Sequence, residues 1–533
     1  MPRFLDEILP LVEQPARYLG TEINVRRKEW RTGMVRFVLC YPDLYELGMS
    51  SLGVRILYGL LNDLPNVVCE RAFLPALDME RICAERKIPL FTLESAVPLK
   101  SCDAVGISLS SELNFTSMLH LLRCADIPLL SIARAEDDPL VVVGGNSAFN
   151  PLPLAPFADV FVIGEGEEVL PEMMEILGMR TTLRRKGTVE ALAALEGVYV
   201  PGVIRGEVRK RFVKDLDAAY FPVDWLVPLT EIIHDRISLE IMRGCGQGCL
   251  FCQAGRCWRP VRLRSPERIR ELAMEAERRT GYEEISFLSF SSGDHPQIGQ
   301  IVESLVANLG RKRVSFSFPS LRIDTFSFKL ATTMQQIRKT GLTFAPETGE
   351  RLRHRIGKNI QDAELLRLAE DARAAGWRQI KLYFMIGLPD ETEDDIRDIV
   401  RLLHELSRII GIKAAFNTFI PKPHTPFEGA GFLPREGYDA RRAILVEGLR
   451  RNRYCALDFH PWEMSCVEAF LARGDERLAP VILRAWESGA CRENWREHFN
   501  LSRWETAFRE CGMEMASYHA PFSGPPPWRF IRA

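Results

Sequence analysis

The sequence predicts an α/β protein with two parallel sheets: a doubly wound domain, then a partial barrel of six βα units, then a helical C-terminal extension. In two long stretches of the chain, short apolar runs alternate with helical patterns. The apolar runs are rich in Val and Ile, which is typical of strands in a parallel sheet that helices cover on both faces. After about residue 430 the sequence becomes rich in Trp and Arg and shows no strand alternation.

Length, composition and charge are those of an ordinary globular protein. The chain has 533 residues, of which 46% are hydrophobic and 26% charged, and a net charge of -2, so nothing global favours nucleic acid or an anionic membrane. The N-terminus lacks the apolar core of a secretion signal, and the longest apolar runs are too short to span a bilayer. We expect a cytoplasmic protein without a membrane span, whose 13 cysteines are buried thiols or ligands rather than disulfides.

The first alternation follows an N-terminal helical segment (1–32) and defines a domain at about 33–178. Strands are predicted at 35–40, 67–73, 103–110, 139–145 and 159–164, and helices at 52–63 and 115–125. The ligand edge of a doubly wound sheet lies at the carboxyl ends of its strands. Polar and glycine-rich turns occur there at 41–51, 108–115, 144–151 and 164–168. The less regular residues 179–231 are expected to form a connector.

The second alternation defines the barrel at 232–430 and leaves 431–533 as the helical extension. Its strands are predicted at 237–242, 284–290, 313–318, 342–347, 379–387 and 413–420. Its helices are predicted at about 266–279, 297–309, 325–339, 361–375 and 391–409. Ser265 and Pro266 form a typical helix start, a capping residue followed by proline at the first helical position. Chemistry in such barrels takes place at the carboxyl ends of the strands.

A cysteine-rich loop follows the first barrel strand. Its sequence is GCGQGCLFCQAG (244–255), with cysteines at 245, 249 and 252. Three thiolates on a short turn can hold three corners of an iron–sulfur cubane and leave one iron open for a small molecule, while the glycines let the backbone wrap a bulky inorganic core. Two alternatives stay open: a zinc site completed by Cys257 or a distant His, and three merely structural thiols. We interpret Cys257 as a neighbour of the site.

The spacing C-x3-C-x2-C, with Phe251 before the third cysteine, resembles the radical SAM superfamily. The resemblance implies a [4Fe-4S] cluster held by Cys245, Cys249 and Cys252, which are then both metal ligands and catalytic residues. It implies that the open iron binds S-adenosylmethionine (SAM), and that one electron cleaves SAM to methionine and a 5′-deoxyadenosyl radical. The expected fold is a partial (β/α)6 barrel, and the expected partners are an electron donor, such as flavodoxin or ferredoxin, and a substrate.

The resemblance also implies cofactor-binding roles elsewhere in the barrel. The residues concerned are Phe251, Ser291, Ser292, Gly293, Asp294, Glu347, Ile386 and Gly387. The turn after the second strand (291–294) would hold the methionine amine, as a variant of a family turn that often has two glycines and an acid. Glu347 would contact the SAM ribose or methionine, and 386–387 would lie beside the adenine. From the residues alone, a barrel-end salt bridge at Glu347 and ordinary strand packing at 386–387 remain alternatives.

A doubly wound domain before such a barrel resembles the cobalamin-binding arrangement. The stretch GGNSAFNPLPLAPFADVFVIGEGEEVLPEMME is similar to the last two strand–turn–helix units of those domains, and nearly the whole chain resembles an uncharacterised family of cobalamin-domain/radical SAM fusion proteins. The histidine signal D-x-H-x-x-G is absent, and His120, inside an apolar helix, is interpreted as an ordinary core or surface histidine. Either cobalamin binds without a protein histidine, or the domain keeps the fold and has lost the cofactor.

The predicted function is that of a radical SAM enzyme that modifies an unknown substrate by hydrogen abstraction or methyl transfer, with methylation favoured if cobalamin binds. RNA, a peptide and a small molecule such as a lipid or pigment precursor are all open as substrates. The alternative is a non-enzymatic RNA-binding protein stabilised by zinc or an iron–sulfur cluster. The basic stretch 255–265 carries Arg256, Arg259, Arg262 and Arg264 and could guide a phosphate-bearing substrate such as RNA; an ordinary basic surface and an anchor for the SAM carboxylate stay open. His424, in PKPHTPF, could act as acid or base or be a bystander in a rigid proline loop.

Overall fold

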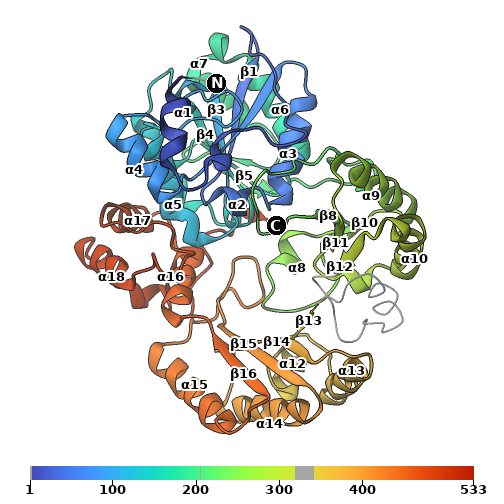
Figure 1. Ribbon diagram of the computed structural model, residues 1–533. Helices are drawn as coiled ribbons and strands as arrows, with labels where there is room; N and C mark the ends of the chain where they lie inside the picture. The colour runs from blue at the N-terminus through green and yellow to red at the C-terminus, as the bar shows by residue number, and fades with distance from the viewer. Residues whose placement is uncertain (1–2, 204–205, 318–340) are drawn as a thin grey trace. The chain divides into compact units, whose positions relative to one another are not determined.

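The computed structural model describes residues 3–203, 206–317 and 341–533, and the chain forms two compact units (Figure 1). The N-terminal unit comprises Met1–Asp235, Leu471–Met515 and Pro527–Ala533. The barrel unit comprises Arg236–Phe470 and Ala516–Pro526. Among the described helices, none is both long and apolar enough to cross a membrane.

The N-terminal unit is built on a six-stranded sheet of order β2-β1-β3-β4-β5-β6. Its strands are β1 (Val35–Tyr41), β2 (Val67–Phe73), β3 (Ala104–Ser108), β4 (Leu140–Gly144), β5 (Val160–Val162) and β6 (Val198–Tyr199). The first five are parallel and β6 is antiparallel to β5. The order 2-1-3-4-5 is a doubly wound order, with its switch point between β1 and β3. All five strands predicted from the sequence are therefore present.

Helices cover both faces of this sheet. They are α1 (Arg3–Ile8), α2 (Tyr45–Gly48), α3 (Leu52–Asp63), α4 (Leu77–Arg86), α5 (Phe115–Cys124), α6 (Gly166–Gly178) and α7 (Arg180–Leu192). Figure 1 shows α3 and α6 on one side and α4 and α5 on the other. α3 has the bounds predicted for it, because its apolar stripe is regular and Ser51 caps it by accepting a hydrogen bond from the Val54 amide.

The segment predicted to be a connector is more ordered than its sequence indicated. It contains α7, the sheet strand β6 and the short strand β7 (Val208–Arg209), which pairs in parallel with β17 (Ile531–Arg532) near the end of the chain. Two-residue strands are too short to show an alternating pattern, so they could not be found from the sequence.

The barrel unit has two sheets of parallel strands, of order β12-β11-β8 and β13-β14-β15-β16. The strands are β8 (Ile237–Glu240), β11 (Glu284–Leu288), β12 (Ser315–Ser317), β13 (Leu342–Glu347), β14 (Gln379–Ile386), β15 (Gly411–Thr418) and β16 (Cys455–Phe459). β9 (Met242–Arg243) and β10 (Arg262–Leu263) form a separate antiparallel pair. The six predicted barrel strands are thus present. β16 is a seventh strand, within the region predicted to be helical.

Four of the predicted barrel helices are present: α9 (Pro266–Thr280), α10 (Ile298–Leu309), α13 (Asp362–Ala374) and α14 (Glu393–Ile409). The described part of the unit also contains α8 (Ala254–Cys257), α12 (Glu350–Arg355), α15 (Arg435–Leu449) and α16 (Trp462–Arg473). Ser265 caps α9 by accepting a hydrogen bond from the Arg268 amide at 3.2 Å. Figure 1 shows α13, α14 and α15 beside β13–β16, and their buried Leu and Ile side chains form one core with that sheet. The helix predicted at 325–339 lies outside the described residues.

Residues Leu471–Met515 of the helical extension belong to the N-terminal unit. This stretch carries α17 (Leu478–Glu487) and α18 (Leu501–Glu510). Between them, Glu493 is fully buried and accepts a hydrogen bond from the Trp504 indole at 2.7 Å, while its other carboxylate oxygen is buried without a partner among the described residues. Burial raises the pKa of Glu493 from its ordinary value of 4.5 to about 7, although Trp504 lowers it.

We predict that Glu493 makes the stability of the N-terminal unit fall as the pH rises. Between pH 4.5 and about 7 the folded protein keeps a proton that the unfolded chain releases. The free energy of unfolding is therefore highest at low pH. It falls, by at most about 3 kcal/mol, as the pH rises through the pKa of the folded protein. Melting temperatures between pH 5 and 8 should fall less steeply in Glu493→Gln than in wild type. Glu505→Gln, at an exposed position on α18, serves as the control, and equal slopes in all three proteins would contradict the assignment.

Candidate functional site

The cysteine loop begins where β9 ends in the barrel unit. Gly244 has a φ of +85°, and a Cβ there would lie 2.5 Å from the Trp258 carbonyl oxygen, so only glycine fits. Just before it, the guanidinium of Arg243 donates to both carboxylate oxygens of Glu240 at 2.9 Å, and both side chains are buried. This bidentate pair fixes the start of the loop.

The far side of the loop packs against the turn after α12. The Leu250 amide donates to the Ile356 carbonyl at 2.9 Å. Gly357 has a φ of +83°, and a Cβ there would come within 2.8 Å of the Gly248 carbonyl oxygen. Two backbone segments about a hundred residues apart in sequence therefore lie in direct contact, and Gly357 is required for both its conformation and its size.

Glu347 lies beside the cysteine loop, at the end of β13. Its Oε1 accepts from Lys358 Nζ at 2.6 Å, and this ammonium also lies 5.9 Å from the centre of the Phe251 ring. The barrel-end salt bridge considered for Glu347 is therefore present. Phe251 itself packs against an apolar cluster that includes Leu352 and Ile356. Burial raises the pKa of Glu347, and Lys358 opposes that rise.

The turn after β11 is joined to the cysteine loop. Gln247 donates from Nε2 to Asp294 Oδ2 at 2.8 Å. Ser291 and Ser292 are buried, and Ser292 exchanges a hydrogen bond with Ser289 at 2.8 Å. Gly293 lies between Ser292 and Asp294 in a single 3-10 turn. The predicted SAM-amine turn is thus adjacent to the predicted cluster loop.

The fifth-strand residues have different environments. The Ile386 side chain is fully buried in the core between the sheet and its helices, and its place beside the adenine stays a prediction. Gly387 has a φ of +89°, and its amide donates to Glu391 Oε1 at 2.9 Å. A Cβ at Gly387 would lie 2.8 Å from the Leu433 Cβ, so this backbone position also requires glycine.

Three buried hydroxyls lie at or just after the carboxyl ends of barrel strands. Ser291 follows β11, Thr348 follows β13 and Thr418 ends β15, and each hydroxyl is buried without a hydrogen-bond partner among the described residues. Buried polar atoms normally have partners, so three unmatched ones at this end of the barrel fit a polar ligand. Sequence reasoning missed Thr348 and Thr418. Their position beside predicted strand ends was the signal that could have found them.

The three thiols of the cysteine loop lie close to one another. Cys245 and Cys249 are each 9% exposed. Burial raises the pKa of Cys249, Lys358 lowers it, and Cys252 and Cys245 raise it, so the three thiols are close enough to act on one another. Within the described ranges, no three His, Cys, Asp or Glu side chains are placed to hold one metal ion. A cubane would bind each of the three thiolates to a different iron. Cys257 lies buried at the end of α8.

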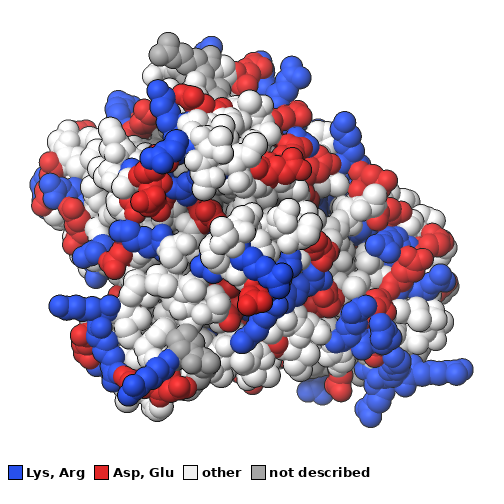
Figure 2. All heavy atoms as spheres, turned by 90° about the horizontal axis from the view of Figure 1, so that it is seen from above, with Lys and Arg blue, Asp and Glu red and all other residues white. Residues whose placement is uncertain are grey.

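Two of the four arginines in the basic stretch after the loop are buried, whereas Arg259 is exposed, so a phosphate-guiding role for this stretch stays a prediction. Arg264 is fully buried, donates to the Glu240 carbonyl at 3.1 Å and lies 3.6 Å from its carboxylate, while Arg262 is buried and donates to the Pro260 and Trp258 carbonyls. These two side chains support the loop. Figure 2 shows Lys and Arg interspersed with Asp and Glu over the face that it presents.

His424 lies in the proline loop after β15. It has a φ of +64°, and its amide donates to Glu428 Oε2 at 2.8 Å. These contacts explain the shape of the loop, and an acid or base role for His424 stays a prediction.

The ligand edge of the N-terminal sheet is partly covered by the chain's own C-terminal segment. The Trp495 indole donates to Asp43 after β1, Arg492 donates to the Pro75 carbonyl after β2, and Asn150 after β4 donates to the Ala472 and Gly474 carbonyls, all between 2.8 and 2.9 Å. Every one of these bonds lies within the N-terminal unit.

The rest of that edge is open and built from the turns after β3 and β4. Ser110 and Asn146 are exposed. Gly145 has a φ of +100°, and a Cβ there would lie 2.4 Å from the Leu109 carbonyl oxygen. The Ser147 hydroxyl is buried without a partner among the described residues. These turns therefore offer a ligand two exposed polar side chains and one unmatched hydroxyl.

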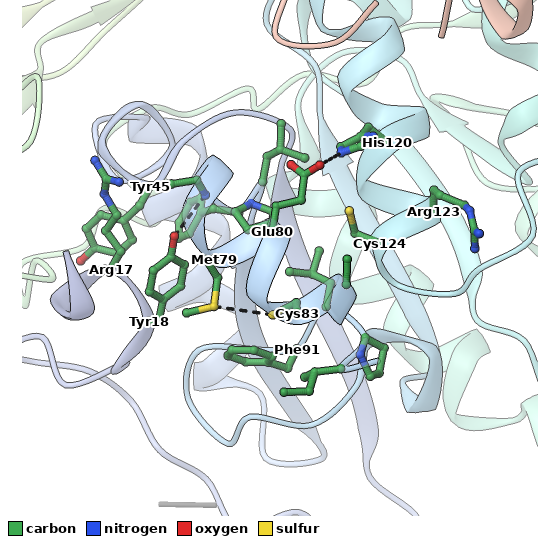
Figure 3. Close-up of a pocket in the computed structure, with 18 of the residues that line it drawn as sticks. Arg17, Tyr18, Tyr45, Met79, Glu80, Cys83, Phe91, His120, Arg123 and Cys124 are labelled. Atoms are coloured by element: carbon green, nitrogen blue, oxygen red, sulfur yellow. Dashed lines mark hydrogen bonds and ion pairs between the residues drawn. The ribbon is translucent and has the colours of Figure 1, made fainter. Parts of the chain in front are cut away.

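His120 takes no part in that edge. Its Nε2 pairs with Glu80 Oε1 at 2.8 Å, and its Nδ1 accepts from the Trp486 indole at 3.4 Å, so both ring nitrogens are engaged. Burial raises the pKa of Glu80, but His120 and Arg492 lower it to about 2. Figure 3 shows the Glu80–His120 pair at one side of a cavity of about 550 Å³ lined mainly by apolar and aromatic side chains of the N-terminal unit. This pairing supports the interpretation of His120 as an ordinary satisfied histidine.

Two family models match the chain. "Radical SAM proteins, N-terminal" matches residues 53–201, and "Radical SAM superfamily" matches residues 239–403. An uncharacterised protein of Methanocaldococcus jannaschii is 27% identical over 452 residues, which are 83% of this chain and 90% of the relative. The anaerobic magnesium-protoporphyrin IX monomethyl ester cyclase of Cereibacter sphaeroides is 24% identical over 60% of this chain and 57% of its own length.

Two solved structures share the fold. The radical SAM methyltransferase TsrM of Kitasatospora setae, with cobalamin and a [4Fe-4S] cluster bound, has a TM-score of 0.52 and 15% identity over 75% of this chain and 76% of its own. The cobalamin-dependent SAM radical enzyme OxsB has a TM-score of 0.52 and 14% identity over 90% of this chain and 71% of its own. These likenesses confirm the fold class of a cobalamin-binding-like domain followed by a partial barrel.

We predict that Gly357→Ala loosens the cysteine loop. The strained φ and the contact with the Gly248 carbonyl should lower the free energy of unfolding by about 2 kcal/mol or more, as measured by urea unfolding. The variant should also retain less iron after reconstitution. Gly299→Ala is the matched control, because Gly299 lies in α10 with no atom within 4 Å of a Cβ and should gain about 0.5–1 kcal/mol. A Gly357→Ala protein with wild-type stability and iron content would contradict the assignment.

Proposed function

Because the chain belongs to the radical SAM superfamily, we propose that it is an enzyme that reductively cleaves SAM at a [4Fe-4S] cluster held by Cys245, Cys249 and Cys252. When bound, the cluster supplies the electron that breaks a carbon–sulfur bond of SAM. A reductant such as flavodoxin or ferredoxin would deliver that electron. A cytoplasmic location stays a prediction.

The observation that carries the proposal is the convergence of three barrel loops. Gln247 joins the cysteine loop to Asp294 in the turn after β11, and Leu250 joins it to the backbone of Ile356. The loop that carries Glu347 is in turn tied to the cysteine loop through Lys358. Thiols, hydroxyls and the two carboxylates of Asp294 and Glu347 therefore lie at the same end of the barrel, where such folds place their chemistry.

Different residues of this chain would hold different groups of SAM. The buried hydroxyls of Ser291, Thr348 and Thr418 can each take up a polar ligand atom. The Glu347 carboxylate can accept from a ribose hydroxyl or from the methionine ammonium. The apolar cluster that includes Phe251 and Leu352 keeps water from the reacting groups, which limits the loss of a reactive intermediate to solvent.

We further propose that cobalamin binds at the open stretch of the N-terminal edge and that the enzyme uses it for methylation of an unidentified substrate. The likeness to TsrM and OxsB and the unmatched hydroxyl of Ser147 support this. Cobalamin, when bound, supplies a transferable methyl group. His120 would not ligate the cobalt, because Glu80 and Trp486 engage both of its ring nitrogens.

The main proposal predicts SAM cleavage by the isolated protein. Anaerobically purified, cluster-reconstituted enzyme is reduced with dithionite and given SAM, and 5′-deoxyadenosine is measured by mass spectrometry. Wild type should form it, and Cys249→Ala should form none because the cluster loses a ligand. Cys257→Ala is the matched control and should keep the activity. If Cys257→Ala were as inactive as Cys249→Ala, the site would be closed by four cysteines and the proposal would be wrong.

The cobalamin proposal predicts binding without an axial protein nitrogen. Hydroxocobalamin added to the protein should co-elute on gel filtration at one per chain. The EPR spectrum of bound cob(II)alamin should show no splitting from a histidine nitrogen, in wild type and in His120→Ala alike. Gly145→Val should lose binding, because its side chain would strike the Leu109 carbonyl. No co-elution with wild type would show that the domain keeps the fold without the cofactor.

A further inference from the structure

The backbone of Glu347, at the end of β13, has a strained conformation that regular strand pairing does not require. β13 pairs regularly with β14 up to Phe344, and its register shifts between Phe344 and Glu347. Glu347 then has a φ of +70°, which is unfavourable for any residue with a side chain. Bulges and strained backbone of this kind re-aim side chains and cluster at functional sites. The strain must be balanced by contacts that hold the new direction.

Lys358 supplies those contacts to the side chain. Its Nζ donates to Glu347 Oε1 and to the Ala345 carbonyl within the bulge, each at 2.6 Å. Both charged side chains are only 12% exposed. Arg353, fully buried, holds the backbone separately through the Pro346 carbonyl at 3.1 Å and the Thr348 carbonyl at 2.8 Å. Arg353 therefore holds only the backbone of the bulge, whereas Lys358 holds both its backbone, at Ala345, and the carboxylate of Glu347.

Lys358 also reaches the cysteine loop. Its ammonium lies over the Phe251 ring, and its neighbour Gly357 is the residue that contacts the Gly248 carbonyl. One side chain thus connects the loop that would hold the cluster with the carboxylate that would hold SAM. A structural role alone would require only one of these connections.

We propose that Lys358 is a positioning residue for SAM: it holds Glu347 Oε1 so that Oε2 is presented to a hydroxyl or ammonium group of the bound SAM. The inference rests on the proposed function, since it deepens the assignment of the SAM site. It predicts that Lys358 and Glu347 act as one unit, so the loss of either should weaken SAM binding with little effect on cluster assembly.

The test measures SAM affinity of the reconstituted full-length protein by equilibrium dialysis and by the SAM-dependent change in the EPR spectrum of the reduced cluster. Lys358→Met should raise the Kd about tenfold or more, as expected for the loss of a charge-assisted hydrogen bond. Lys358→Arg should recover most of the affinity. Glu347→Gln combined with Lys358→Met should be no weaker than Glu347→Gln alone, because coupled residues are not additive.

Lys312→Met is the matched control. Lys312 forms a Lys–Glu pair of the same 2.6 Å length with Glu277 on the surface of the barrel unit, and its loss should leave the Kd unchanged. Far-UV circular dichroism and iron content show whether Lys358→Met folds and loads. An unchanged Kd in a folded, loaded Lys358→Met protein, or additive effects in the double variant, would overturn the inference. A wild-type protein that binds no SAM would instead overturn the proposed function.

Discussion

Backbone contacts that only glycine allows hold the cysteine loop in its place, and the rest of the site depends on them. Gly244 turns beneath the Trp258 carbonyl, and Gly357 lies against the carbonyl of Gly248. The contact at Gly357 brings the chain that follows β13 up to the thiols, and with it Lys358 and Glu347. A side chain at either glycine would push these segments apart. The free-energy cost of that displacement would exceed what a single hydrogen bond contributes.

Buried charges then fix the directions that the backbone allows. Beneath the loop, Glu240 pairs with Arg243 and lies near Arg264, so three charges largely satisfy one another. Beside it, Lys358 and Glu347 form a second buried pair. Buried pairs add little net stability, but losing one partner is costly. Here the buried pairs fix each loop in one conformation. A site that must hold a ligand at several points requires such fixed loops.

The sequence predicted what depends on local pattern and missed what depends on distant contacts. The strands and α3 were predictable because their apolar periods are regular, and the cysteine loop because its spacing is specific. β16 was missed because its five residues form a strand only beside β15. Arg262 and Arg264 were considered part of a basic surface. Nothing in the local sequence shows that backbone carbonyls accept hydrogen bonds from these side chains. Lys358 carries no motif, and only the fold brings it to Glu347.

The N-terminal edge shows how the same fold can be adapted without its usual histidine. The C-terminal segment bonds to the turns after β1, β2 and β4, so one part of the edge is satisfied by the chain itself. What stays open is the stretch that includes Ser110 and Asn146, shaped by Gly145. A ligand there would be held by backbone amides, hydroxyls and shape rather than by a metal–nitrogen bond. Its affinity would then depend on how firmly these turns are held, and so on the C-terminal segment, although Ala472 and Gly474 lie more than 300 residues further along the chain than Asn150.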